Sequence, residues 1–223
     1  MVFYVKLNDI MTRIYNRPFF KVAELILVYV GLPLLYYLNL IPFHKSIPLL
    51  LVFTICLFFL LRDKSFNRRQ LGFNGFRSWR PVLLRFAVFS VFTTIAVWLI
   101  APAKLFIMPL KNTGLWLMIM VFYPLWSAFP QELIYRSWFF NRYRDLFKRE
   151  WLFIATNAFL FSFSHIIFRN WLALVLTFAG GLVFALTYTK SRSLMTVFVE
   201  HTLYGDFIFT VGIGQFFYMT LNS

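Results

Sequence analysis

The sequence predicts an all-α, polytopic helical membrane protein with seven, or eight, transmembrane helices. Of its 223 residues 61% are hydrophobic, 22% aromatic and 13% charged, whereas soluble domains are roughly 45–50% apolar. The mean hydropathy is +0.72. The apolar runs are long and continuous, which excludes the alternating pattern of barrel strands. We therefore expect a single membrane domain over 1–223.

Seven apolar runs predict the spans, because each approaches the length that crosses a bilayer as a helix. They lie at 22–42, 46–61, 81–101, 114–140, 152–168, 171–189 and 193–219. The last run carries Gly205, Gly212 and Gly214, where it could break into an eighth helix.

Lysine and arginine residues set the expected orientation. Their numbers before, between and after the runs are four, one, six, two, four, one, two and zero. Positive residues concentrate on the cytoplasmic side, so we expect 1–21 to be a basic cytoplasmic N-terminus. The formal charge of +14 then indicates contact with anionic lipid rather than nucleic acid. We expect an integral protein of a bacterial inner (plasma) membrane, with the lipid bilayer as a partner and no nucleic-acid partner.

Ionisable residues inside a span cost on the order of 2.5–3.5 kcal/mol each on insertion scales. Glu24 follows Lys21 by three residues, and a local ion pair explains it. Glu132, His165 and the Glu200/His201 pair need another explanation. Among them, His165 in "FLFSFSH" is the one that packing alone would most easily explain.

Glu132 and Arg136 are one helical turn apart, in the favourable order for an ion pair. One interpretation is a self-compensating buried pair. Pro130 suggests a second, because a proline starts or kinks a helix and leaves a gap that water can enter.

The expected depths of Glu132, His165 and His201 in the membrane can be compared from their distances to the nearest turns. With a turn near 149, Glu132 lies 17 residues before it and His165 lies 16 after it. At ~1.5 Å per residue both are roughly 24–26 Å from the turn. His201 is about 10 residues past a turn near 191, roughly 15 Å deep. The sequence thus predicts Glu132 level with His165, and His201 offset by two turns unless those helices tilt or the fourth extends as a surface helix. Both histidines are expected within reach of Glu132 and Arg136.

A glutamate and two histidines around a hydrated cavity can polarise water for peptide-bond hydrolysis. Alternatively, His165, His201 and Glu132 could ligate a zinc ion with an open position. The spacing leaves metal-dependent and metal-free hydrolysis both open, so zinc is the one cofactor considered.

Three stretches, "QELIYR", "FSFSH" and "EHTLYGD", resemble in order the three motifs of the CAAX-protease and bacteriocin-processing (CPBP) family of intramembrane proteases. Those motifs are EExxxR, FxxxH and HxxxN or HxxxD. The resemblance covers roughly 110–219. It implies that Glu132, Arg136, His165 and His201 line an active site facing a cavity inside the bilayer.

Two positions depart from the family pattern. Gln131 stands at the first glutamate of the pair, and Gly205 at the asparagine or aspartate of the third motif. Three alternatives follow: Glu132 acts as the base with His165, Asp206 supplies the missing polar group if the helix opens at Gly205, or the chain is an inactive relative.

The sequence therefore predicts an intramembrane endopeptidase acting on a membrane-associated or lipid-anchored protein or peptide. Glu132 is the expected base, and Arg136 holds it. His165 and His201 bind water, metal or the developing oxyanion, and Gln131 donates a hydrogen bond to substrate. A pseudoprotease or membrane chaperone that binds partner helices is the alternative. A small transporter is less well supported, since no two-fold hydropathy repeat is present.

Overall fold

The chain folds as a helix bundle, and the described residues contain no β-strand. The computed structural model describes residues 17–75 and 78–217. Most of the predicted N-terminal segment 1–21, and the end of the last predicted run, lie outside these ranges. The α-helices are α2 (Pro18–Ile26), α3 (Leu32–Tyr37), α4 (Ser46–Arg62), α5 (Arg80–Ile100), α6 (Ile107–Lys111), α7 (Thr113–Tyr123), α8 (Phe129–Glu132), α9 (Phe139–Arg142), α10 (Glu150–Phe163), α11 (Trp171–Ser191) and α12 (Leu194–Val211).

Several of these segments join into longer continuous helices. The π-helical turn Leu27–Gly31 connects α2 to α3. Two further π-helical turns, Pro124–Ala128 and Leu133–Trp138, connect α7, α8 and α9 into one helix. The 3-10 turn Ser164–Phe168 extends α10. Shorter 3-10 turns lie at Arg68–Leu71, Pro102–Lys104, Arg144–Leu146 and Gly214–Phe217.

The all-helical class and its membrane character are confirmed. Five helices are long and apolar enough to cross a bilayer: Pro18–Tyr37, Arg80–Ile100, Thr113–Arg142, Glu150–Phe168 and Trp171–Ser191. The apolar helix α4 is shorter, and α12 is not among the five. Each predicted run nevertheless coincides with a helix. The count of seven or eight spans and the cytoplasmic N-terminus stay predictions.

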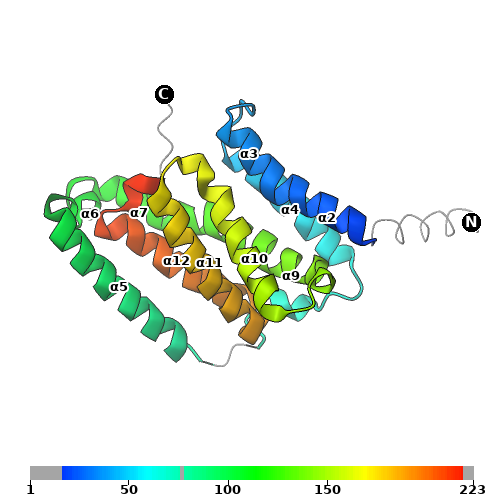
Figure 1. The fold of residues 1–223 in the computed structure, drawn as a ribbon. Helices are drawn as coiled ribbons and strands as arrows, with labels where there is room; N and C mark the ends of the chain where they lie inside the picture. The colour runs from blue at the N-terminus through cyan, green and yellow to red at the C-terminus, as the bar shows by residue number, and fades with distance from the viewer. Residues whose placement is uncertain (1–16, 76–77, 218–223) are drawn as a thin grey trace, which may run out of the picture.

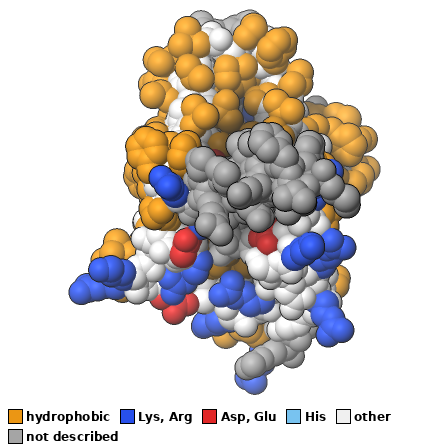
Figure 2. Space-filling view, turned by 90° about the vertical axis from the view of Figure 1, so that its right-hand side faces the viewer, with side chains coloured by type: hydrophobic (Ala, Val, Ile, Leu, Met, Phe, Trp, Pro, Cys, Tyr) orange, Lys and Arg blue, Asp and Glu red, His pale blue; other side chains and the backbone are white. Residues whose placement is uncertain are grey.

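The helices α10, α11 and α12 form the middle of the bundle, with α2, α3 and α4 beyond one side and α5 along the opposite edge (Figure 1). Helix α5 packs against α12, whereas α4 packs against the π-helical turn that precedes α9. Large apolar side chains of α5 are exposed, including Val88, Phe92 and Ile100. In Figure 2, hydrophobic side chains cover the upper part of the molecule and Lys and Arg the lower part. This division suits a protein that is partly covered by lipid.

Charged residues tie α2 to the end of α9. Lys21 pairs with Asp145 at 2.8 Å, and Glu24 pairs with Arg142 at 2.8 Å. The predicted local pair of Lys21 with Glu24 is therefore wrong. Both side chains instead reach residues more than a hundred positions away, because packing brings those residues to the end of α2.

The helices α10 and α11 are packed closely together at Gly181. A Cβ at this position would lie 3.1 Å from the Cα of Ala158 and 3.2 Å from the side chain of Phe161. A larger residue would push apart the two helices that carry part of the site. Gly114 of α7, by contrast, has open space around it.

We predict that Gly181→Leu lowers the free energy of unfolding by about 1–3 kcal/mol, since the added side chain overpacks this contact. Gly114→Leu is the matched control, and its better helix propensity should leave stability unchanged or raise it by up to about 1 kcal/mol. Denaturant unfolding in detergent micelles measures both. Equal stability of the two variants would contradict the role of Gly181.

Candidate active site

The continuous helix from Thr113 to Arg142 positions the first motif. Pro124 and Pro130 both lie inside it and have no N–H to donate, and π-helical turns accommodate the missing hydrogen bonds. Pro130 therefore does not begin a separate span. Gln131 and Glu132 are adjacent in α8, about 100° apart around the helix axis, and therefore face different neighbours.

Glu132 is completely buried, and both of its carboxylate oxygens face cationic or donor groups. Oε1 accepts a hydrogen bond from Nδ1 of His201 at 2.8 Å. Oε2 lies 3.2 Å from Nε of Arg136, whose side chain is also fully buried. The predicted ion pair one turn apart is thus present. It is extended by His201, which the depth estimate had placed two turns away.

The difference in depth has a simple origin. The helix of Glu132 ends at Arg142, and the segment up to Glu150 is a 3-10 turn and irregular chain rather than helix. Glu132 is thus about 10 residues, or ~15 Å, from the end of its helix at Arg142. His201 is about 7 residues, or ~10 Å, from the start of α12. His165 is ~22 Å from the start of α10. The prediction that Glu132 and His165 lie at the same depth is wrong, and His201 is the histidine that contacts the Glu132 carboxylate.

Arg136 connects the first motif to the two helices that follow. Its guanidinium donates hydrogen bonds to Oδ1 of Asn157 on α10 and, at 3.5 Å, to the carbonyl oxygen of Gly181 on α11. The guanidinium also lies 5.2 Å from the ring centroid of Phe161 and 5.9 Å from that of Phe184. Arg136 therefore balances the buried charge of Glu132 and holds three helices together.

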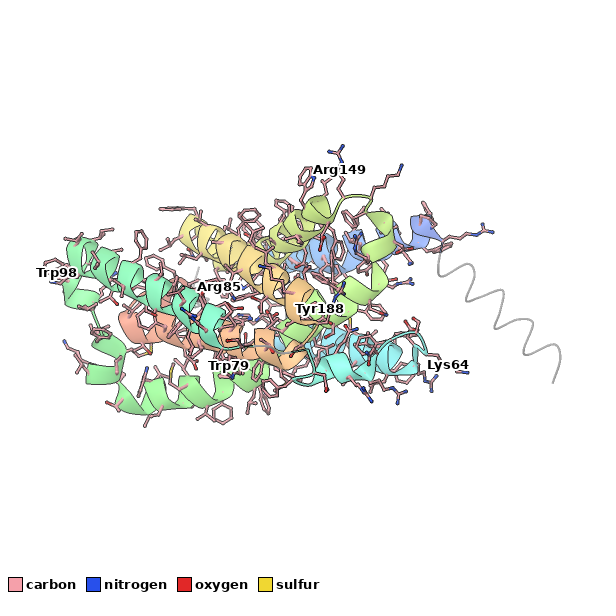
Figure 3. The ribbon with its side chains drawn as sticks, turned by 90° about the horizontal axis from the view of Figure 1, so that it is seen from below. Lys64, Trp79, Arg85, Trp98, Arg149 and Tyr188 are labelled. Atoms are coloured by element: carbon pink, nitrogen blue, oxygen red, sulfur yellow. The ribbon has the colours of Figure 1, made fainter. Side chains whose placement is uncertain are left out.

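Replacing Arg136 with methionine should lower the stability of the protein by about 3–5 kcal/mol, because it leaves the Glu132 carboxylate buried without its cation. Lys64→Met is the control, since Lys64 is exposed and points away from the bundle (Figure 3). Thermal unfolding of both variants in detergent measures the difference. If Arg136→Met unfolds at the same temperature as Lys64→Met, the pair does not stabilise the fold.

His201 has fixed partners on both sides of its ring. Because Nδ1 donates to Glu132, Nε2 of the neutral imidazole is an acceptor, and the hydroxyl of Tyr123 lies 3.0 Å from it. The ring stacks on Phe184, with centroids 4.7 Å apart and planes at 24°. The result is a chain of three groups, carboxylate, imidazole and phenol, held in one orientation.

His165 presents a free nitrogen. Its Nδ1 is 2.7 Å from the carbonyl oxygen of Phe161, so Nδ1 carries the proton and Nε2 is left with a lone pair. Within the described ranges no hydrogen-bond partner contacts Nε2. The ring of Phe161 contacts both imidazoles, at centroid distances of 4.9 Å to His165 and 5.6 Å to His201.

Both histidines line one large cavity of about 1780 Å³. Gln131, Tyr123 and Gly205 lie in the same wall, and most of the remaining lining is apolar. Glu132, Arg136 and Asp206 are not among the lining residues. The resemblance implied that Glu132 and Arg136 would face the cavity, but they lie behind its wall.

Of the three positions that define the first motif, Gln131, Glu132 and Arg136, Gln131 is the one that lines the cavity. Its amide Nε2 donates to Oγ of Ser127 at 2.8 Å, whereas its carbonyl Oε1 is buried without a partner. Buried acceptors are normally satisfied by protein or water. Gln131 therefore lines the cavity while its Oε1 is buried next to the wall as an unused acceptor.

Asp206 does not reach the cavity. The alternative in which the helix opens at Gly205 does not hold, since α12 is continuous from Leu194 to Val211. The helix ends instead at Gly212, whose φ of 110° suits a residue without a side chain. The continuous helix places Asp206 one position past Gly205, away from the lining.

Glu200 has a separate role from its neighbour His201. Its Oε1 accepts from Arg85 of α5 at 2.7 and 3.1 Å, and the same guanidinium donates to Oγ1 of Thr187 at 2.9 Å. Arg85 lies where α5 meets the central helices (Figure 3). This buried carboxylate therefore attaches α5 to α11 and α12.

The residues considered as zinc ligands do not form a ligand set. In the described part of the chain, no group of three His, Cys, Asp or Glu side chains could hold a metal ion. Glu132 is occupied by His201 and Arg136, and the Phe161 ring contacts both imidazoles. We derive no step that uses a metal.

Sequence reasoning missed Tyr123 and Asn157. Both side chains are polar but uncharged. They therefore lack the large cost of inserting a charge into the membrane that singles out Glu132 and Glu200. Asn157 is fully buried and also donates to the carbonyl oxygen of Tyr135 at 2.7 Å. An uncharged amide in the middle of the run 152–168 is the signal that could have identified it.

Part of the chain is similar to a known protein family. Residues 112–205 match the model of a protein family described as type II CAAX prenyl endopeptidase Rce1-like. This range contains all three motifs, and it confirms the resemblance to the CPBP family. No curated protein and no solved structure matches the chain.

Proposed function

We propose that this chain, whose residues 112–205 match the Rce1-like family, is an intramembrane endopeptidase of the CAAX type. Its substrate is a peptide bond in a membrane-associated or lipid-anchored protein. The observation that carries the proposal is the pair of imidazoles on the wall of one large, mainly apolar cavity. One imidazole has a free nitrogen, and a buried carboxylate orients the other.

We assign the general base to His165 rather than to Glu132. The free Nε2 of His165 belongs to a residue that lines the cavity, whereas both oxygens of Glu132 face other side chains behind the wall. A base must be within hydrogen-bond reach of the proton that it removes. Glu132 then acts through His201, whose tautomer and orientation it sets.

The proposed reaction is direct attack of water on the scissile carbonyl carbon. Nε2 of His165 accepts a proton from the water as its oxygen forms the new bond. When the C–N bond breaks, the protonated His165 returns that proton to the leaving amine. Gln131 also lines the cavity, and its buried, unpartnered Oε1 can accept a hydrogen bond from the attacking water once the side chain turns toward the cavity, a role that needs an acceptor but not a carboxylate.

The first test compares wild type with His165→Ala, each purified and reconstituted in liposomes with extracted membrane proteins. We expect new peptide termini in the wild-type sample, detected by mass spectrometry, and their loss in the variant. An internally quenched peptide with an S-farnesyl cysteine three residues before its C-terminus provides a kinetic probe. If termini and probe cleavage are equal in both samples, or absent from both, the chain is not a protease; binding without cleavage would favour the pseudoprotease alternative.

Chemical rescue separates the two candidate bases. The cavity has room for a small molecule, so added imidazole should restore part of the probe cleavage lost in His165→Ala. The same imidazole should not restore Glu132→Gln, whose defect lies behind the wall. Rescue of Glu132→Gln together with no rescue of His165→Ala would assign the base to Glu132 instead.

The cavity also carries a cation that suits a peptide's C-terminal carboxylate. Lys45, in the connection between α3 and α4, lines the cavity with its ammonium 4.5 Å from the ring centroid of Phe168. No carboxylate pairs with it within the described ranges. Burial lowers the pKa of Lys45 to about 8, so it is charged below that pH and neutral above it.

We therefore expect the KM of wild type for the farnesylated probe to rise as the pH passes 8. Lys45→Ala should raise this KM about 10-fold or more at neutral pH, the value of a charged hydrogen bond. A probe with a C-terminal amide should show neither effect, and Lys64→Ala is the control. Equal KM values for acid and amide probes would exclude Lys45 as the carboxylate site.

A further inference from the structure

The third motif lacks a polar side chain at position 205, and the structure places a phenol in that space. A Cβ built on Gly205 would overlap the hydroxyl, Cε1 and Cζ of Tyr123. The glycine is therefore required by the tyrosine beside it. Two helices contribute to this contact, with Tyr123 at the end of α7 and Gly205 within α12.

The Tyr123 hydroxyl fills the space beside Gly205 and also lies close to the residues proposed for catalysis. It lies 3.0 Å from Nε2 of His201, and Tyr123 lines the same cavity as His165 and Gln131. Its ring packs edge-on against Phe209, with centroids 5.5 Å apart, and against His201 at 6.1 Å. The phenol is thus held in place by contacts on α12, with its polar end at the cavity wall.

We infer that Tyr123 is a catalytic residue that replaces the missing side chain at 205 and stabilises the oxyanion of the tetrahedral intermediate. This inference rests on the proposed function. In the free enzyme the hydroxyl donates to Nε2 of His201. Rotation about the Cζ–O bond turns the same proton toward a carbonyl oxygen in the cavity, so no proton is gained or lost.

The Glu132–His201 pair determines where the Tyr123 proton points before the hydroxyl rotates. Because Nδ1 of His201 donates to Glu132, Nε2 can only accept while the ring is neutral. His201 therefore holds the phenol proton near the cavity in the free enzyme. When charge develops on the substrate oxygen, the hydroxyl exchanges its hydrogen bond to His201 for one to that oxygen, while the packed ring stays in place.

Tyr123→Phe should lower kcat for the farnesylated probe by about 10²–10³, the effect of removing one oxyanion donor, with KM changed less than about 3-fold. Tyr188→Phe is the matched control. It removes another phenol hydroxyl, which contacts Gln70 and Ser137 and lies outside the cavity lining. A kcat equal to that of Tyr188→Phe would overturn the inference.

An exchange of the two positions tests the replacement directly. Gly205→Asn should be inactive, because its side chain collides with Tyr123, and Tyr123→Ala should be inactive because it has no hydroxyl. The double variant Tyr123→Ala/Gly205→Asn has both the space and the polar group, and we expect at least a 10-fold recovery of kcat over Tyr123→Ala. A folded double variant, shown by thermal unfolding, with no recovery would overturn the inference.

A third measurement does not depend on activity. The chain has only three histidines, His44, His165 and His201, so nitrogen NMR of histidine-labelled protein can follow each ring. Tyr123→Phe should shift the Nε2 signal of His201, assigned with His201→Gln, and leave that of His165 unchanged. An unchanged His201 signal would refute the contact itself. A shifted signal with no probe cleavage by wild type would instead refute the proposed function.

Discussion

The carboxylate of Glu132 is buried completely, and this single charge constrains the arrangement of the helices around it. Removing a carboxylate from water is costly unless charged and hydrogen-bonded partners replace the solvent. Arg136 supplies the opposite charge from one turn away, and His201 supplies a donor from α12. Arg136 in turn needs Asn157 of α10 and the carbonyl of Gly181 on α11. Satisfying one buried charge therefore requires three other segments in a defined register.

This network divides the polar groups of the site into two layers. Glu132 and Arg136 lie behind the wall, where they are inaccessible to a molecule in the cavity. Neutral polar groups lie on the wall itself: an amide at Gln131, a phenol at Tyr123 and two imidazoles. Lys45 and Arg85 add positive charge to the lining, whereas most of the remaining surface is apolar and suits an apolar part of a substrate. The ionised residues set the orientation of the neutral ones.

Much of this organisation could be predicted. Uninterrupted apolar runs identify the helices, and each predicted run coincides with one. The i,i+4 spacing of Glu132 and Arg136 predicts their ion pair, which the structure contains. Predictions of contacts between helices were less successful. The depth estimate assumed a turn near 149, but the helix ends at Arg142, so Glu132 is nearer in depth to His201, which contacts it, than to His165. Irregular chain between helices changes such distances, and hydrophobic periodicity does not report it.

The sequence by itself determined the class of protein, the positions of its helices and the few polar residues that cannot be left in lipid without partners. These follow from local composition and spacing, because the cost of burying a charge and the length of a span hold in any fold. Only the tertiary structure decided which residues face the cavity and which lie behind it. The tertiary structure also shows that the side chain of Tyr123, from another helix, fills the space next to Gly205. Tyr123 and Gly205 are 82 positions apart in the chain, and only helix packing brings them together. The sequence around either residue does not predict this contact.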